Sequence, residues 1–260
     1  KNLLAIGMLI GTTVLGCTSG WLRFLTVVAM LLGGIGFILT DGRAQFLAVI
    51  VAFMAMGFLS GRLGSYVKML FAAIFLAAIL QSIYPMQIAE RAVSAFSEDD
   101  VSRQDREAEA MNVAVPYVLT HPFGAGTGAL SSGNSSKVWA KSKVDTVLTS
   151  GYVHNNFLLI AIEAGWLGAV VWVWFLVTII LSSRKAFLDA TDPFLKDLAL
   201  GLYGVMVAYI ILNFFAPMLM VGLISFEIWI LLGLIPVIQT LESQNKAGMV
   251  TVSTLPAPAV

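Results

Sequence analysis

Long apolar runs separated by short polar connections make up most of this chain. Their lengths suit membrane crossing, because a helix needs roughly 17 to 25 mostly apolar residues to span about 30 Å of hydrocarbon. We recognise seven such runs, at about residues 3–17, 22–40, 44–60, 66–84, 156–181, 197–215 and 218–238. The pattern predicts an all-α, polytopic transmembrane bundle of about seven spans. The first run is short and could be a truncated or a tilted span. The last two have only Ala216 and Pro217 between them, so they form either a tight hairpin or one kinked helix.

One polar region, residues 85–155, divides the chain. It follows four predicted spans in residues 1–84 and precedes three in residues 156–240. Residues 241–260 form a tail that ends in a mixture of Pro, Ala and Thr, which is typical of disorder. Lys and Arg are more frequent in the short connections on one side of the bundle, and this bias favours the cytoplasm for that side. The large loop is therefore predicted to be periplasmic and the tail cytoplasmic.

Inside the loop, the segment DDVSRQDREAEAMNVAVPYVL predicts a helix. Its acidic start suits a helix N-terminus. Pro116 would bend this helix or end it near Val115, since proline has no N–H and its ring clashes with the preceding turn. Arg103 and Arg106 lie three residues apart and therefore share one side of the helix.

The composition supports the same class of protein. Hydrophobic residues make up 58% of the chain and charged residues 12%, against roughly half and about a quarter in soluble domains. Lys plus Arg and Asp plus Glu number 15 each, so the net charge is zero and no basic field indicates nucleic acid. The single cysteine, Cys17, falls in an apolar run, which excludes a disulfide framework and a thiolate metal cluster. Because the chain starts at Lys1 without an initiator Met, we expect an N-terminal portion to precede it.

His154, one of two histidines, stands directly before the apolar run at residues 156–181. Asn155 or Asn156 is a good N-cap for that helix, so the imidazole would be carried by a rigid element. A histidine that is neutral near pH 7 can accept a proton, which is the role of a general base. A lone histidine at a membrane interface can also be a structural residue with satisfied hydrogen bonds. Both interpretations stay open on the residues alone.

Two ionisable residues lie in or beside apolar runs, where a charge is costly and should face protein or water. Arg43, in LTDGRAQF, either anchors a helix end with Asp41 as its partner or meets a local anion on the periplasmic side. Glu163 lies nine residues after His154, about half a turn round the predicted helix, and is interpreted as a buried hydrogen-bonding residue or a second catalytic group. The acidic residues 98–100 could hold a divalent cation, but they lack EF-hand spacing. A solvated helix start explains them better, so no metal site is predicted.

The loop also contains a glycine-rich stretch, THPFGAGTGAL, in which Gly124, Gly126 and Gly128 alternate with small residues. Glycine accepts positive φ and lets backbone N–H groups approach a ligand, so the stretch could be a turn that cradles an anion. Its spacing is equally typical of a flexible corner. The stretch follows no predicted strand and lacks the Walker A lysine, so neither known nucleotide-binding loop is supported.

Three segments, taken together, resemble the O-antigen ligase and Wzy O-antigen polymerase superfamily, bacterial membrane glycosyltransferases that act on undecaprenyl-diphosphate-linked glycans. TDGRAQFLAVIV is similar to the family's Ser-Arg-Gly segment that opens a transmembrane helix. The block from Arg106 to HPFGAGTGAL is similar to an arginine followed by Pro and a Gly-x-Gly-x-Gly turn, and HNNFLLIAIEAGWLG fits a His-Asn, Leu, Glu-x-Gly-x-x-Gly pattern. The resemblance covers roughly residues 39–174. Gly42 stands where the family usually has Ser, and the aromatic residue usual after the loop arginine is absent near Ala110 and Met111.

The resemblance implies a metal-independent enzyme of GT-C-like architecture in the bacterial inner membrane, with no cofactor. It would ligate or polymerise saccharide from an undecaprenyl-diphosphate-linked donor onto a glycan or lipid-linked acceptor, on the periplasmic face. By position, Arg43 and Arg106 would bind the diphosphate, and His154 would be the base at the reacting centre. Five further residues would support the site: Arg103, Asn155, Glu163, Gly124 and Gly126. Arg103 could also replace Arg106 in binding the diphosphate.

Two other classes of protein stay open. In a transporter or flippase of lipid-linked glycan, the same residues would line a passage, although no paired broken helices with inverted-repeat character are evident. A non-catalytic subunit of polysaccharide assembly is the other class. Members of the superfamily have more than seven spans, so the chain is expected to be a C-terminal portion.

Overall fold

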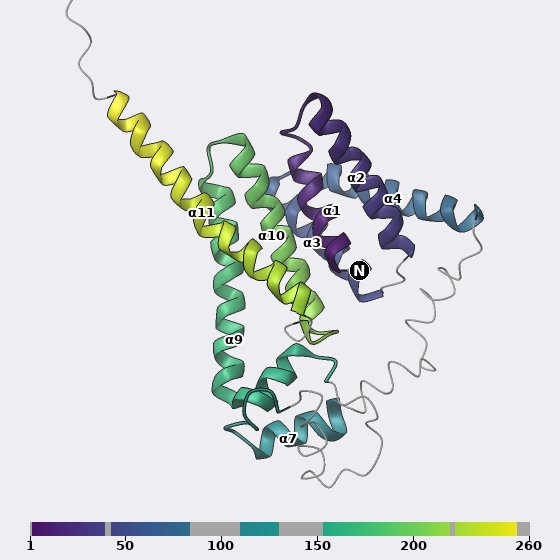
Figure 1. Ribbon diagram of the computed structural model, residues 1–260, viewed down its shortest axis with the longest axis vertical. Helices are drawn as coiled ribbons and strands as arrows, with labels where there is room; N and C mark the ends of the chain where they lie inside the picture. The colour runs from purple at the N-terminus through teal and green to yellow at the C-terminus, as the bar shows by residue number, and fades with distance from the viewer. Residues whose placement is uncertain (1, 40–42, 84–109, 130–152, 219–221, 254–260) are drawn as a thin grey trace, which may run out of the picture.

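The computed structural model describes residues 2–39, 43–83, 110–129, 153–218 and 222–253 (Figure 1). Within these ranges every regular element is helical and no strand occurs, which confirms the all-α prediction. In chain order the elements are α1 (Asn2–Val14), α2 (Gly20–Leu39), α3 (Arg43–Ser60), α4 (Leu63–Ile83), the π-helix η1 (Ala110–Ala114), α7 (Val115–Thr120), α9 (Asn156–Asp189), α10 (Pro193–Asn213) and α11 (Gly222–Ser253).

The long helices of the described ranges coincide with the apolar runs of the sequence. Four of them, α2, α9, α10 and α11, are long and apolar enough to cross a membrane. The apolar parts of α1, α3 and α4 are shorter. The chain is therefore a multi-pass membrane protein. The number of seven spans, the GT-C-like architecture and the periplasmic position of the loop stay predictions.

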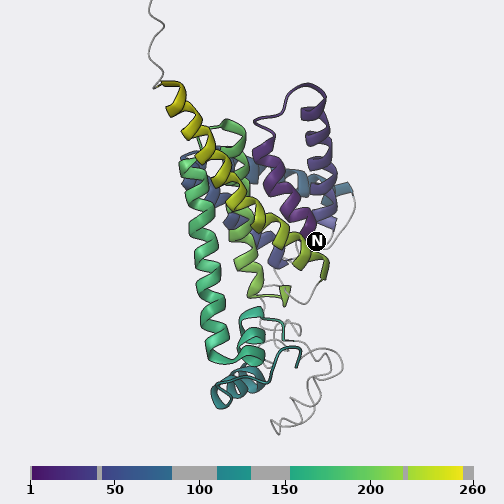
Figure 2. The same cartoon turned by 60° about the vertical axis from the view of Figure 1, so that its left-hand side comes forward.

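Helix α10 lies at the centre of the bundle and packs against α1, α3, α9 and α11 (Figures 1 and 2). Its glycines allow close approach: a Cβ on Gly201 would lie 2.6 Å from the Thr13 hydroxyl oxygen, and one on Gly204 would lie 2.2 Å from the Met56 sulfur. Small residues at such crossings let helices pack tightly in a membrane, where no hydrophobic effect drives helix association. Asp197, near the start of α10, lies beside Gly16, which follows α1. It also interacts electrostatically with Tyr66, which packs on Gly57 in the last turn of α3. The ends of α1 and α3 therefore meet the start of α10, and α10 runs antiparallel to both.

The last two predicted spans form a hairpin. Helix α10 ends at Asn213, α11 begins at Gly222, and the two helices pack together while running in opposite directions (Figure 1). The alternative of one kinked helix is therefore wrong.

Helix α11 continues to Ser253, so the prediction of a disordered tail from residue 241 has to be corrected for residues 241–253. This stretch contains good helix formers such as Glu, Gln, Lys, Ala and Met. Two of its side chains also bind the turn between α9 and α10. Glu242 accepts hydrogen bonds from the N–H and the hydroxyl of Thr191, and Lys246 Nζ donates to the Asp189 carbonyl at 2.7 Å. The remainder of the predicted tail lies outside the described residues.

Helix α9 differs from the prediction at Gly165, which has φ 71° and ψ −169°. The apolar run at residues 156–181 was predicted as one continuous helix, but α9 consists of a short first segment and a long second segment that ends at Asp189. The two segments point in different directions, and the second rises along α10 (Figure 1). The half-turn placement of Glu163 relative to His154 is also wrong, because His154 precedes the helix and its Asn155 cap.

Part of the predicted loop helix is described. The π-helix η1 passes into α7 at Val115, and Pro116 occupies the first turn of α7, so the helix changes where the proline predicted a bend or an end. The earlier part of the predicted helix, with Arg103 and Arg106, lies outside the described residues.

Candidate active site

His154 lies half-buried at the start of α9, directly before the residue that caps this helix. Asn155 has an extended backbone, and its Oδ1 accepts hydrogen bonds from Phe157 N at 2.9 Å and Leu158 N at 3.1 Å. These bonds satisfy two of the N–H groups that a helix leaves free at its start. The predicted N-cap is confirmed, and of the two candidates it is Asn155. The imidazole is therefore attached to a fixed helix end.

The start of α9 is tied to the end of α10 by two buried amides. Asn156 and Asn213 are both fully buried, and Asn156 Nδ2 donates to Asn213 Oδ1 at 2.6 Å. Asn213 Nδ2 in turn donates to the Tyr209 carbonyl at 2.6 Å. Hydrogen bonds of this kind are strong in apolar surroundings, where each unpaired amide would be costly. Sequence reasoning missed Asn213, although a single amide at the end of an apolar run was a usable signal.

A small second hydrophobic cluster joins α7 to the first segment of α9, beyond one end of the bundle (Figure 1). Val153, next to His154, is 1% exposed and packs in this cluster, whose other fully or mostly buried members are Ala114, Tyr117, Ala129, Leu159 and Ile162. The residue before His154 is thus as firmly held as the residue after it.

The glycine-rich stretch binds the break in α9 through its backbone. Ala125 N donates to the Ile162 carbonyl at 2.7 Å, and Gly126 N donates to the Glu163 carbonyl at 3.0 Å. On the other side of the break, Trp166 N donates to the Pro122 carbonyl at 2.9 Å. A helix break leaves such carbonyl and N–H groups without helical partners, and the loop supplies the partners.

This arrangement differs from both sequence interpretations of the stretch. A flexible corner would have no such partners. An anion cradle needs N–H groups that point at the ligand, whereas the N–H groups of Gly124, Ala125 and Gly126 are donated to carbonyls of the protein, with His121 O as the acceptor for Gly124. The glycines therefore join two parts of the chain, and their support of a reaction stays a prediction.

Two glycines are required where the two backbones cross. Gly124 has φ 73° and Gly165 has φ 71°. A Cβ on Gly165 would lie 2.2 Å from the Pro122 carbonyl oxygen, and a Cβ on Gly124 would lie 2.6 Å from the Glu163 carbonyl oxygen. Any other residue would combine an unfavourable φ with a clash against backbone. Sequence reasoning identified Gly124 but treated Gly165 as an ordinary helix residue.

The side chain of Trp166 adds a further link between the same segments. Its indole Nε1 donates to the Val118 carbonyl in α7 at 2.8 Å. Glu163 is half-buried in the last turn before the break, and its backbone carbonyl accepts the hydrogen bond from Gly126 N. A catalytic or supporting role for the Glu163 side chain stays a prediction.

Arg43 is the first residue of α3, and its backbone lies at the same end of the bundle as His154. Helix α3 is antiparallel to α10, so its start is at the level where α10 ends, and Asn213 at that end is bonded to Asn156 of α9. Since Arg103 and Arg106 lie outside the described residues, the convergence of the arginines on His154 stays a prediction.

The other histidine and the cysteine are placed differently. His121 stacks on Tyr117 with 4.0 Å between the ring centroids, and its Nδ1 is 2.9 Å from the Thr120 hydroxyl. Cys17 lies in the turn between α1 and α2, at the opposite end of the bundle, with Sγ 3.1 Å from Asp197 Oδ2. Desolvation and the hydrogen bond to Asp197 raise the pKa of this thiol to about 11, which disfavours the nucleophilic thiolate. Among the residues that the structure describes, no three His, Cys, Asp or Glu side chains gather in a way that could hold a metal ion.

Comparison with known protein families gives a match that covers the candidate site. A protein family described as O-antigen ligase matches residues 28–173, which is more than half of the chain. This segment extends from α2 into the second segment of α9 and includes Arg43, the glycine-rich stretch, His154 and Gly165. No curated protein and no solved structure matches the chain.

Proposed function

Because this chain belongs to the O-antigen ligase family, we propose that it transfers glycan from an undecaprenyl-diphosphate-linked donor to a glycan or lipid-linked acceptor on the periplasmic face of the inner membrane. The proposal covers both ligation and polymerisation, which differ only in the acceptor. The observation that carries it is the position of His154, held between a buried valine and the Asn155 cap at the mouth of a membrane helix.

In the proposed reaction, the hydroxyl oxygen of the acceptor attacks the anomeric carbon of the donor sugar. The bond from that carbon to the diphosphate oxygen breaks, and the hydroxyl proton moves to the imidazole of His154. The new glycosidic bond and a lipid diphosphate are the products. A positioned base of this kind typically contributes about 10²- to 10⁴-fold to a rate.

The departing diphosphate gains negative charge, and arginine suits it because the guanidinium stays cationic and binds phosphate through paired N–H groups. Arg43 and Arg106 are assigned to this role, and Arg103 is the alternative on the loop. The position of the start of α3 at the His154 end supports the first assignment. With the charge neutralised by arginine, the proposed chemistry requires neither a metal ion nor an organic cofactor.

A flippase is the rival to be tested, because transporters often contain broken helices whose free backbone groups bind substrate. Helix α9 is broken at Gly165, but the glycine-rich stretch binds the groups freed by the break. The break is thus filled by the protein's own backbone, which favours a fixed reaction site over a substrate passage.

The proposal is tested by reconstituting the complete chain in vesicles with a lipid-diphosphate-linked donor and a labelled acceptor. His154→Ala is expected to lower transfer about 10²-fold or more while donor binding is retained. His121→Phe, which keeps the aromatic stack on Tyr117, is the matched control and should leave transfer within about twofold of the starting rate.

The arginine assignment is tested in the same vesicles. Arg43→Ala should raise the KM for the donor about tenfold or more, because a charge-assisted contact to phosphate is lost. Arg23→Ala, at the opposite end of the bundle, should not. Transfer that survives both His154→Ala and Arg43→Ala would show that the site is wrongly assigned. Movement of intact donor across the bilayer, with its linkage unchanged by mass spectrometry, would support the flippase instead.

A further inference from the structure

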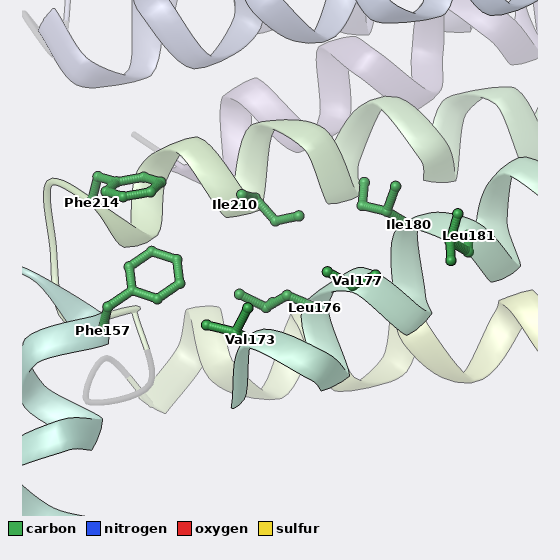
Figure 3. Close-up of a pocket in the computed structure, with 8 residues that line it drawn as sticks. All are labelled: Phe157, Val173, Leu176, Val177, Ile180, Leu181, Ile210 and Phe214. Carbon is green, nitrogen blue, oxygen red and sulfur yellow. The ribbon is translucent and has the colours of Figure 1, made fainter. Parts of the chain in front are cut away.

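An apolar groove with a volume of about 530 Å³ follows the seam between α9 and α10 (Figure 3). This volume falls within the range of roughly 300–1,000 Å³ that is usual for small-molecule sites. All the side chains that line it are aliphatic or aromatic, and most come from the second segment of α9: Val173, Leu176, Val177, Ile180 and Leu181. Such walls suit a hydrocarbon chain and disfavour sugar or phosphate, which would lose their hydration without gaining hydrogen bonds.

The groove is a strip along one face of α9. Its five α9 residues follow the spacing i, i+3, i+4, i+7 and i+8, which places them on one side of a helix over about 12 Å of its length. Leu176 is buried and forms part of the floor, whereas Val177 and Leu181 are 49% and 56% exposed at the rim. The groove is therefore open along its outer side, where a chain could enter from the bilayer.

One end of the groove lies beside the candidate active site. Phe157 and Phe214 line this end, with 4.6 Å between their ring centroids, and Ile180 and Leu181 lie at the other end (Figure 3). Phe157 comes three residues after His154. Phe214 directly follows Asn213, the residue that binds Asn156. The groove thus leads from the His154 end of the bundle into the depth of the membrane.

The dimensions of the groove favour a single chain as its occupant. Helices α9 and α10 pack directly against each other, so the groove is a hollow in their common surface. Over the length of about 12 Å given above, a helix about 10 Å across would occupy roughly 900 Å³, which is more than the groove's volume of about 530 Å³. If the head group of a bound chain lies at His154, it lies at the Phe157 end of the groove, and the chain extends from there toward Leu181.

We propose that this groove binds the polyprenyl chain of the donor, starting with the isoprene units next to the diphosphate. The inference rests on the proposed function, since the diphosphate at the active site is what brings the chain to the Phe157 end. A polyprenyl chain in the bilayer is already in hydrocarbon, so the groove gains contact and shape selection but no hydrophobic burial. Its effect is expected in the KM for the donor and in the choice of lipid, and not in kcat.

Val177 and Val171 offer a matched pair for the test. Both lie in the second segment of α9 and both are 49% exposed, but only Val177 lines the groove. In reconstituted transfer, Val177→Phe should raise the KM for an undecaprenyl-diphosphate donor at least fivefold with kcat within twofold. It should leave the KM for a donor with a single isoprene unit within twofold. Val171→Phe should change neither value. An unchanged KM in Val177→Phe, or an equal rise for both donors, would overturn the proposal.

A second measurement does not depend on glycan transfer and so separates this proposal from the proposed function. A photoreactive p-benzoylphenylalanine is placed at position 177 or 171 of the complete chain, in vesicles of phosphatidylethanolamine and phosphatidylglycerol that contain radiolabelled undecaprenyl phosphate. Illumination should attach label at position 177 at least fivefold more than at 171. Equal labelling at the two positions would mean that bulk lipid contacts both. If a tenfold increase in phosphatidylglycerol abolishes the labelling at position 177, the groove binds an ordinary phospholipid. Either result would overturn the groove assignment even if transfer is observed.

Discussion

The two ends of the second segment of α9 are held in different ways. At the Gly165 end, backbone groups of the glycine-rich stretch bond directly to backbone groups of the helix. At the Asp189 end, side chains of α11 make the contacts: Gln239 Nε2 donates to the Ser182 carbonyl at 3.1 Å, and Glu242 and Lys246 bind the following turn.

The difference has a physical consequence. Side chains have several rotatable bonds and can follow a shift of the helix, whereas two crossing backbones without intervening Cβ atoms cannot move without losing their contact. The tight end is the one near His154. Position is thus fixed most firmly where the proposed chemistry needs it, because catalysis is sensitive to misplacements of about 1 Å.

The largest effect is expected from Gly165→Ala. The substitution places a Cβ 2.2 Å from the Pro122 carbonyl oxygen at a φ of 71°. Backbone strain of about 1–3 kcal/mol and overpacking of about 1–3 kcal/mol should together lower stability by about 3 kcal/mol or more. The thermal unfolding midpoint in detergent and the glycan transfer rate should both fall, the first measured by tryptophan fluorescence.

Gly126→Ala is the control for that experiment. Gly126 has φ 96°, but a Cβ there would have nothing within 4 Å, so this variant carries strain without a clash. Its midpoint should lie between those of the unsubstituted protein and Gly165→Ala. If the two variants unfold at the same temperature, the close crossing of the backbones contributes nothing to stability.

A smaller effect is expected at the other end of α9 from Glu242→Ala. Loss of the carboxylate leaves the Thr191 N–H and hydroxyl without the acceptor that binds both, so the midpoint should fall by about 4 °C. Glu242→Gln keeps one acceptor oxygen, so its unfolding midpoint should fall by less. Transfer at a temperature where each variant is folded should stay within twofold of the starting rate. A tenfold loss of transfer in Glu242→Ala would mean that the two ends of the helix segment are coupled and that the Gly165 end is not held independently.

The smallest effect is expected from Trp166→Phe. It removes the hydrogen bond from Nε1 to the Val118 carbonyl but keeps the aromatic ring and the backbone bond to Pro122. This is a single neutral hydrogen bond from a half-exposed indole, so its loss should lower the midpoint by no more than about 2 °C. Trp174→Phe, at an exposed position in the same helix segment, should cause no change. If Trp166→Phe matches Gly165→Ala, the indole and not the crossing of the backbones is the main link between α7 and α9.

Much of the fold could be predicted, because the signals were local. An apolar run of sufficient length specifies a membrane helix whatever it packs against, and the long helices of the described ranges lie on the predicted runs. The Asn155 cap was recognisable for the same reason, since a cap depends only on the residues that follow it. The length of α11 was underestimated because its last turns are held by contacts with a turn about 50 residues earlier in the chain.

The candidate site was predicted in part, and the missing part is a contact between distant segments. A glycine inside an apolar run is usually a tolerated helix residue, so nothing near Gly165 indicated a break. The reason for the break lies in the stretch around Gly124, about 40 residues earlier, which supplies the partners for the freed backbone groups. The resemblance to the O-antigen ligase family did rest on both glycine-containing segments, HPFGAGTGAL and HNNFLLIAIEAGWLG. The structure shows why they belong together: each glycine makes room for the backbone of the other.

The crossing at Gly124 and Gly165 holds the helix in position without depending on the side chains around it. Because the contact is made by backbone, it imposes no chemistry on the neighbouring side chains, and Phe123, Ala125 and Thr127 all point outward with exposed surfaces. These positions can be exchanged without moving the helix that carries His154. Related chains could in this way diverge toward different saccharides while two glycines keep the reaction centre in register.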